Sequence, residues 1–384
     1  MSLILGIEST CDETAAAVVA DGWDVRSNVV ATQIELHAKY RGVVPEIASR
    51  AHIQNILPVL RESLEVARVT LEEIDAICVT HRPGLIGSLL IGLTAAKTLA
   101  WALDKPFIGV DHVQAHLYSV KLAAQRKSFF PSFGTPGAGE GGGRASDVNA
   151  IQPPPHSSPA GVPEEEERRD IPMPAVGLAV SGGHTSLYHL ESFSQIQLLG
   201  STLDDAVGEA YDKVAAILGL GYPGGPVIDG LAANGSATAI KFPRTLLGKR
   251  SLDFSFSGIK TAVLYHVRGF QGRQRRADSL SPAEVRDVAA SFQAACIDVI
   301  VQKLRRALSQ TRAKCIIIGG GVSANRGLRQ ALQRFDVPAF FPLLPYCTDN
   351  AAMSAGLANL LLHAGHRSPL DLNAQTQSEF AVTP

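Results

Sequence analysis

Two histidines four residues apart are the first feature of the sequence that could do chemistry. His112 and His116 follow an apolar run, Phe107–Val110, that is typical of a short strand. On a helix the two would share one face, and that spacing suits two imidazole ligands of one metal ion. The zinc peptidase motif HExxH is excluded, because Val113 stands where its general-base glutamate would be. The pair is therefore compatible with a metal site or with two hydrogen-bonded histidines.

A third ligand would favour the metal site, and Asp349 is the candidate. It stands directly before an Ala-rich segment, Ala351–Leu362, that is typical of a helix. The alternative is that Thr348 or Asp349 only caps this helix. The sequence leaves both roles open.

Three further segments carry groups suited to binding a nucleoside. Gly225 lies in a Gly- and Pro-rich loop where a ligand could approach the backbone closely. Asp212 and Asp229 flank that loop, and each is either an acceptor for a ribose diol or an ordinary surface carboxylate. Asn325 follows a strand and a glycine turn, so it is either a ligand contact or an N-cap. That turn matches GxGxxA, but no second half-sheet follows it, so we do not interpret it as a dinucleotide site.

The elements that must position these groups form two similar hairpins. Each consists of an apolar strand, a polar turn and a second strand: Leu3–Glu8, Ser9–Thr14 and Ala15–Ala20 in the first, and Ala175–Val180, Ser181–Thr185 and Ser186–Leu190 in the second. The turns expose backbone amides and hydroxyls that can bind phosphate. Two such hairpins predict a duplicated fold with two facing lobes.

Helices and further strands alternate along the rest of the chain, which predicts α/β lobes. Helical periodicity covers His52–Val66, Gly87–Leu103, Leu203–Leu218, Pro282–Leu308 and Ala324–Gln333. Strand patterns cover Ala76–Thr80, Phe107–Val110 and Lys314–Ile318. Between the two hairpins, residues 127–170 are rich in Gly, Pro and Glu, and this composition predicts a disordered insert.

Composition limits the class of protein. Of 384 residues, 46% are hydrophobic and 18% charged, which allows a sizeable core. The net charge of -1 excludes binding of nucleic acid by bulk positive charge. Five cysteines form no CxxC pair and fit a reducing cytosol. We find no signal peptide and no apolar stretch long enough to cross a membrane, so we expect a cytoplasmic protein.

A series of motifs in register resembles the TsaD family, the tRNA N6-adenosine threonylcarbamoyltransferases. They are GIESTCDET (6–14), GVVPEIASR (42–50), HVQAH (112–116), SGGHT (181–185), YPGGP (222–226), DFSFSGIK (253–260), GGVSAN (320–325) and CTDN (347–350). SGGHT and FSFSGIKT are most similar to the bacterial branch. The resemblance covers nearly the whole chain except the insert.

The resemblance implies an actin-like (ASKHA) α/β fold of two duplicated lobes with the active site in the cleft between them. Lobe I would comprise residues 1–120 and a C-terminal helix at about 350–370, and lobe II residues 172–349. The implied reaction moves a threonylcarbamoyl group from threonylcarbamoyl-AMP to N6 of adenosine 37 in tRNAs that read codons beginning with A, with release of AMP. Implied partners are tRNA, a TsaB-like paralogue and a TsaE-like ATPase, with no membrane.

The resemblance also implies roles for single residues. A divalent metal, expected to be Fe²⁺ with zinc as the alternative, would be held by His112, His116 and Asp349. Substrate contacts would carry over to Ala179, Val180, Ser181, Gly182, Gly183, Asp212, Gly225, Asp229 and Asn325. For the proton of the attacking amine we expect Asp12 or Glu13 as the catalytic base. Competing interpretations are an ATPase or kinase of the same fold, a metalloendopeptidase, which is an older label of the family, and a non-catalytic scaffold.

Two single positions depart from the family pattern. Asp111 stands where the family usually has Asn before the first histidine, and Arg82 replaces the first Gly of Gly-Pro-Gly-Leu. Neither change removes a ligand. For tRNA we expect a local basic track, formed by Arg244, Lys249, Arg250, Lys260, Arg268, Arg273, Arg275 and Arg276.

Overall fold

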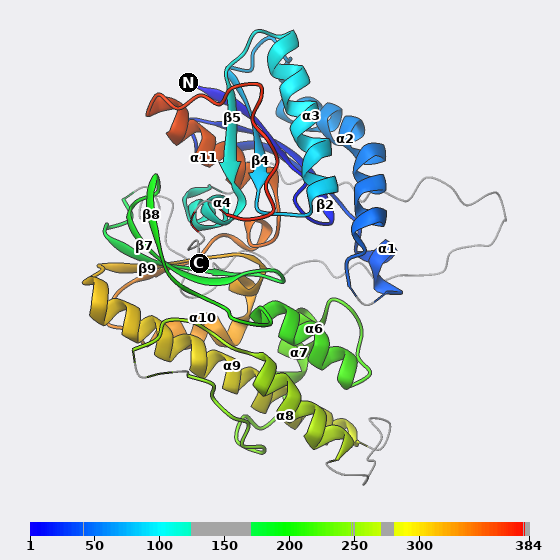
Figure 1. The fold of residues 1–384 in the computed structure, drawn as a ribbon, viewed down its shortest axis with the longest axis vertical. Helices are drawn as coiled ribbons and strands as arrows, with labels where there is room; N and C mark the ends of the chain where they lie inside the picture. The colour runs from blue at the N-terminus through cyan, green and yellow to red at the C-terminus, as the bar shows by residue number, and fades with distance from the viewer. Residues whose placement is uncertain are drawn as a thin grey trace, which may run out of the picture.

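The computed structural model describes residues 1–40, 42–123, 170–246, 248, 250–269, 280–378 and 380. Two five-stranded mixed sheets lie one above the other, with helices on their faces (Figure 1). The first sheet has the order β3-β2-β1-β4-β5 and the second β10-β9-β6-β7-β8. The strands of the first are β1 (Leu3–Glu8), β2 (Glu13–Ala20), β3 (Asp24–Thr32), β4 (Ala76–Arg82) and β5 (Phe107–Asp111), and those of the second are β6 (Ala175–Val180), β7 (Thr185–Ser192), β8 (Gln195–Ser201), β9 (Cys315–Gly319) and β10 (Ala339–Phe340).

Both sheets are built in the same way. Three antiparallel strands follow one another along the chain, and two parallel strands are then added beside the first of them. β1 pairs with β2 so that Leu3 faces Ala20, and β6 pairs with β7 so that Ala175 faces Leu190. This repetition confirms the duplication that the two hairpins predicted.

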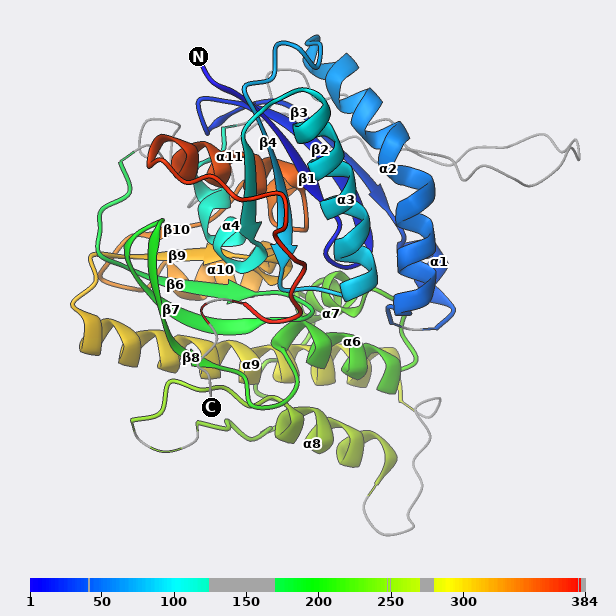
Figure 2. The same cartoon turned by 45° about the horizontal axis from the view of Figure 1, so that its top comes forward.

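Alternation of side chains along β1 explains how helices cover the first sheet. Leu5 and Ile7 pack with α2 (Pro45–Ala67) and α3 (Ile86–Ala102) on one face. Ile4 points to the other face, where α11 (Ala351–His363) packs. The second sheet carries α9 (Pro282–Thr311) along its outer face (Figure 2). Further helices in the described residues are α1 (Ile34–Ala38), α6 (Val207–Ile217), α7 (Gly224–Ala232), α8 (Ser257–Arg268) and α10 (Arg326–Leu332), with 3₁₀ turns at Ser119–Lys121, Gly321–Ala324 and Leu344–Tyr346.

The short helix α4 (His112–Tyr118) lies between the two sheets (Figures 1 and 2). All of its residues are buried, and Val113 and Leu117 share one apolar core with Ile4 of the first sheet and Ile317 of the second. A Cβ at Gly319 would overlap the backbone of His116, so the second sheet requires glycine where it meets this helix. Packing from both sides therefore fixes the position of α4.

Most predicted elements are confirmed, but two helices do not begin where the sequence pattern predicted. The helix predicted from His52 is α2, which already begins at Pro45. The second shift is at the start of α6. The pattern predicted a helix from Leu203, but α6 begins at Val207. Leu203 instead donates its amide to Phe254 O, and Asp204 accepts hydrogen bonds from Ser255 and Ser257. These contacts hold 203–204 in a bend that follows the isolated bridge between Thr202 and Phe254.

Three other expectations can be compared with the structure. Of the insert at 127–170, all but Asp170 lies outside the described residues. All five cysteines are free, as expected from their spacing. Within the described ranges no helix combines the length and the hydropathy needed to cross a bilayer.

Candidate active site

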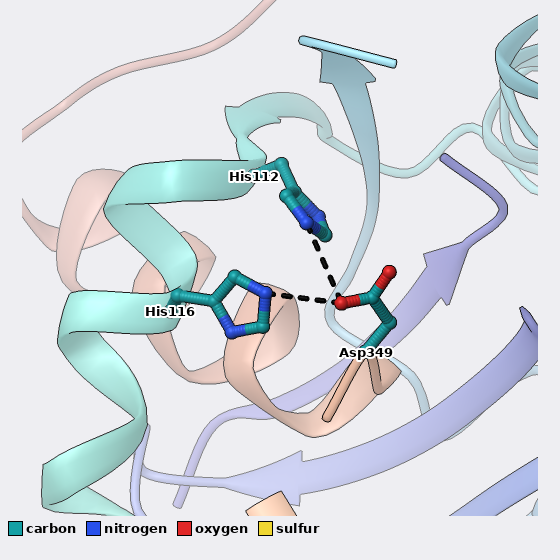
Figure 3. A group of neighbouring side chains, drawn as sticks. All are labelled: His112, His116 and Asp349. Carbon is teal, nitrogen blue, oxygen red and sulfur yellow. Dashed lines mark hydrogen bonds and ion pairs between the residues drawn. The ribbon is translucent and has the colours of Figure 1, made fainter. Parts of the chain in front are cut away.

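The beginning of α4 sets the direction of the two histidines. Asp111 is the N-cap, and its Oδ1 accepts hydrogen bonds from the amides of Val113 and Gln114. His112 occupies the first helical position and His116 the position one turn later, so both imidazoles point to the same side (Figure 3). The predicted helical spacing is confirmed.

Asp349 faces both imidazoles from the far end of the chain (Figure 3). Its Oδ1 lies 3.5 Å from Nε2 of His112 and 3.0 Å from Nε2 of His116. Asn350, and not Thr348 or Asp349, caps α11 by accepting from the Met353 amide, so the capping alternative is wrong. The Asp349 carboxylate is therefore directed at the histidines.

The three side chains could hold one metal ion. Their ligand atoms all lie within 4.8 Å of one another, and in the part of the chain that the structure describes no other group of His, Cys, Asp or Glu meets this geometry. Two imidazoles and one carboxylate leave coordination positions open, which a substrate-binding metal needs and a closed structural site does not have.

The electrostatics of the three side chains favour a cation between them. Burial alone would lower the pKa of His112, but the carboxylates of Asp349 and Glu8 raise it to about 9. Burial likewise raises the pKa of Asp349, yet the two histidines outweigh it and hold that pKa below its ordinary value. Burial and the His112 charge lower the pKa of His116. The carboxylates thus favour a positive charge at His112, next to the position that a metal ion would occupy. Two imidazoles and one carboxylate are a donor set that suits such an ion.

Sequence reasoning missed the residues that orient His112. Its Nδ1 lies 3.4 Å from Oε2 of Glu8 and 3.3 Å from Oγ1 of Thr10. Glu8 is fully buried, and its Oε1 accepts from the Thr10 amide. A carboxylate on the far nitrogen fixes the ring and leaves Nε2 for Asp349 or a metal. The signal was the acidic residue that ends the apolar strand at Glu8.

A cavity of 570 Å³ opens beside His112 and Asp349. Its walls come from both halves of the molecule, with Thr10 and Gly84 on one side and Ser181 and Asp212 on the other. Gly182 and Gly183 also line it, and a Cβ on either would meet no atom within 4 Å. The Gly-rich turn therefore presents its backbone to open space, as expected of a phosphate-binding turn.

A second cavity of 400 Å³ adjoins the first, since Asp12, Gly182 and Asp212 line both. Its lining includes the other residues predicted for the site: Glu13, Gly225, Asp229 and Asn325. Asn325 also caps α10 by accepting from Leu328, so both interpretations of this residue hold geometrically. Tyr222 lines both cavities and was not predicted.

Two of the predicted substrate residues line neither cavity. Ala179 and Val180 belong to β6, and their side chains are buried in the apolar cores. They position the Ser181–Gly183 turn at the end of the strand, where Ser181 donates its amide to His184 O. Contact between these two residues and a ligand stays a prediction.

Asp12 and Glu13 differ in their surroundings although they are neighbours. Asp12 lines both cavities, whereas Glu13 lines the second one only. Burial, followed by repulsion from the Asp12 carboxylate, raises the pKa of Glu13 well above its ordinary value. A carboxyl group with a raised pKa is suited to accept a proton near neutral pH.

Comparison of the sequence with known proteins identifies its family. The sequence model of "TsaD: tRNA N6-adenosine threonylcarbamoyltransferase" matches residues 24–135 and 160–356. The chain belongs to the TsaD family. A tRNA N6-adenosine threonylcarbamoyltransferase of Symbiobacterium thermophilum is 46% identical over 97% of this chain and 95% of its own length. One of Moorella thermoacetica is 45% identical with the same coverage.

Solved structures agree in fold with this TsaD chain. HypF of T. kodakarensis matches with a TM-score of 0.55 at 14% identity, over 94% of this chain and 48% of HypF. A nucleotide-bound HypF matches with a TM-score of 0.52 at 13% identity, over 96% of this chain and 47% of that one. With the two equivalent sheets, these likenesses confirm the expected actin-like, duplicated α/β fold.

Proposed function

We propose that the paired cavities transfer a threonylcarbamoyl group from threonylcarbamoyl-AMP to N6 of adenosine 37 in tRNAs that read codons beginning with A. The observation that carries the proposal is the arrangement of the site. His112 and Asp349 of the His–His–Asp group line one cavity together with the Gly-rich turn, and Asp229 and Asn325 line the adjoining one. One side could hold the acyl and phosphate groups and the other the adenosine.

The chemistry of the reaction explains what these residues need to do. The donor is a mixed anhydride with AMP as a good leaving group, whereas the exocyclic amine of adenosine is a weak nucleophile. The protein therefore contributes mainly positioning and stabilisation of charge. The amides of Gly182 and Gly183 would bind the phosphate. The side chains of Asp212, Asp229 and Asn325 would bind the nucleoside.

His112, His116 and Asp349 would hold a divalent metal ion, for which we propose Fe²⁺ with zinc as the alternative. When bound there, the ion supplies a Lewis acid for an oxygen of the threonylcarbamoyl group. Glu8 and Thr10 keep the His112 ring oriented. Glu13, with Asp12 beside it, would accept the proton that leaves the amine as the new C–N bond forms and AMP departs.

A single reaction tests the proposal. Purified protein is mixed with threonylcarbamoyl-AMP, its partner proteins and unmodified tRNA, and the digested nucleosides are weighed. We expect threonylcarbamoyl-adenosine from the wild type, none from His112→Ala, and a full yield from the matched control His363→Ala, an exposed histidine at the end of α11. No product from metal-loaded wild type with intact tRNA would contradict the function and favour the kinase or scaffold alternative.

The peptidase alternative is not favoured. Val113 occupies the glutamate position of the peptidase motif, inside a helix that is buried between the sheets. The named relatives are threonylcarbamoyltransferases. A kinase would release ADP from ATP, which a separate reaction of the purified chain with Mg-ATP and without the partner proteins can report.

Exposed apolar side chains on α2 and α3 support the proposal of a TsaB-like paralogue as a partner. Ile53 and Leu57 lie one turn apart on α2 and are 60% and 68% exposed. Ile86 and Leu90 have the same spacing on the neighbouring α3 and are also exposed. We therefore propose that the α2–α3 face binds this paralogue and that Leu57→Asp weakens the complex in size-exclusion chromatography.

Two of the basic residues predicted to bind tRNA form ion pairs within the protein. Arg244 pairs with Asp298 and Lys260 pairs with Asp205. Lys249, Arg273, Arg275 and Arg276 lie outside the described residues. We propose that tRNA binds over this region, and that a TsaE-like ATPase acts with the enzyme in the cytoplasm. The five free cysteines support that compartment.

A further inference from the structure

The C-terminal segment after α11 returns to the active-site cleft. Figure 2 shows it in red, running from α11 past β4 and β5 towards β7. Ser368 fixes its first part, because its amide donates to Phe107 O and its hydroxyl accepts from the Gly109 amide. Further along, the Gln375 amide donates to His81 O over 3.0 Å. The segment is thereby held along the edge formed by β4 and β5.

Arg82 and Asp111 hold the part of this segment that reaches the cleft. Arg82 Nε lies 3.6 Å from Asp111 Oδ2, and a second guanidinium nitrogen of Arg82 donates to Oε1 of Gln375 over 3.2 Å. The Ser378 hydroxyl donates to Asp111 Oδ2 over 2.7 Å. The two residues at which the sequence departs from the family pattern thus form an ion pair between a partly buried arginine and a buried aspartate, and both bind the C-terminal segment.

Thr376 lies between these two attachment points and lines the same cavity as His112 and Asp349. Asp111 performs two tasks at once, since its Oδ1 caps α4 while its Oδ2 accepts from Ser378. A shift of the segment would therefore move the Asp111 side chain, and with it the first turn of the helix that carries His112. The side chain of Asp111 is 1% exposed and that of Arg82 18% exposed. Because water screens these two charges poorly, removing one of them would leave the other without a compensating charge.

We propose that Arg82 and Asp111 are positioning residues that fasten residues 375–378 against the start of α4, so that the C-terminal segment forms one wall of the metal-side cavity, the 570 Å³ cavity beside His112. The inference rests on the metal site of the proposed function and adds residues that act through it. Phe380 extends the attachment to the second sheet, with its ring centroid 6.4 Å from that of Tyr188. The segment therefore touches both sides of the cleft.

The experiment compares amide hydrogen exchange of residues 372–378 and metal affinity, measured by competition with a chelator, in the full chain. Ser378→Ala removes one attachment and Arg82→Gly the other. We expect each to speed exchange at Gln375 by about tenfold or more, because a buried charged hydrogen bond is lost. Metal affinity should fall by about tenfold, as for other residues that orient metal ligands.

Matched variants separate the ion pair from general damage. Asp111→Asn keeps an N-cap oxygen for α4 but removes the charge. Its effect on exchange should be smaller in the Arg82→Gly background than in the wild type, because the arginine it leaves unpaired is then absent. Arg26→Gly removes an arginine that pairs with Asp24 on the outer strand β3, and it should change neither quantity.

Three results would decide the matter. Unchanged exchange in both Ser378→Ala and Arg82→Gly would overturn the fastening. Faster exchange with metal affinity and donor KM equal to those of the wild type would overturn the role as a cavity wall. Faster exchange in both variants, together with a wild type that binds no metal and transfers nothing, would support the fastening and refute the proposed function instead.

Discussion

Asn325 Nδ2 donates a hydrogen bond to Gln293 Oε1 over 2.8 Å, deep beside the second cavity. The same glutamine donates from Nε2 to Oδ1 of Asp229 over 3.2 Å, and the Tyr211 hydroxyl reaches its Oε1 over 3.4 Å. Gln293 lies on α9 and is 8% exposed. One buried amide therefore fixes the distance between the two side chains that we assign to the adenosine.

Replacing Gln293 by Leu should weaken binding of AMP without preventing folding. Leucine has a similar size but leaves the Asn325 Nδ2 group and the Asp229 Oδ1 atom without this partner, so the two side chains would no longer be held at a fixed distance from each other. We expect AMP affinity to fall by roughly tenfold in isothermal titration calorimetry, one hydrogen-bond increment. Gln302→Leu, a partly buried glutamine on the same helix, is the control and should bind AMP normally. Equal affinities in the two variants would refute the role of Gln293.

Two glycines at the cleft should respond to alanine in opposite ways. A Cβ at Gly225 would meet nothing within 4 Å, so Gly225→Ala should keep the melting temperature but reduce AMP affinity, because the methyl group enters the second cavity. A Cβ at Gly208 would lie 2.6 Å from Ser181 O, so Gly208→Ala should destabilise the fold by about 1–3 kcal/mol. Calorimetry of both variants checks the contrast. A normal AMP affinity in Gly225→Ala would place the nucleoside elsewhere.

The local sequence pattern was sufficient to predict most helices and strands and the shared helical face of the two histidines. The periodicity of β1, β2, β6 and β7 predicted two hairpins, and the spacing of His112 and His116 predicted a shared helical face, because both are properties of neighbouring residues. Asp349 was a candidate ligand from the sequence, but only the family resemblance favoured that role over a helix cap, since nothing in the local sequence brings residue 349 to residue 112.

The residues that support the site could not be predicted in the same way. Gln293 stands in the middle of a long amphipathic helix, where a glutamine carries no pattern that distinguishes it from a surface residue. Ser378 and Asp111 are separated by 267 positions, and their hydrogen bond depends on the course of the whole C-terminal segment. Such contacts are set by tertiary packing, which a motif does not encode.

Removing the metal should abolish transfer while leaving the fold intact. Val113 and Leu117 anchor α4 in the core between the sheets, and Asp111 caps it, so the helix does not depend on a metal for its position. We expect chelator-treated protein to lose threonylcarbamoyl-adenosine formation, to regain it on addition of Fe²⁺, and to melt cooperatively throughout. Loss of the melting transition after chelation would show a structural metal instead.

The pH dependence of the transfer step should follow Glu13. Its pKa is raised first by burial and then by the Asp12 carboxylate, so the group stays protonated above its ordinary pKa of 4.5. A base must be ionised, and the single-turnover rate should therefore rise with pH through the raised pKa.

Asp12→Asn removes the repulsion and should move this rise to lower pH, whereas Glu13→Gln should abolish it. The stability of the fold should change with pH in the opposite direction to the rate. Between pH 4.5 and the raised pKa the folded state binds more protons than the unfolded state, so the free energy of unfolding falls as pH rises. Glu13→Gln should therefore be more stable than the wild type above this range, as denaturant titration at two pH values can measure. A rate profile that Glu13→Gln leaves in place would exclude Glu13 as the base.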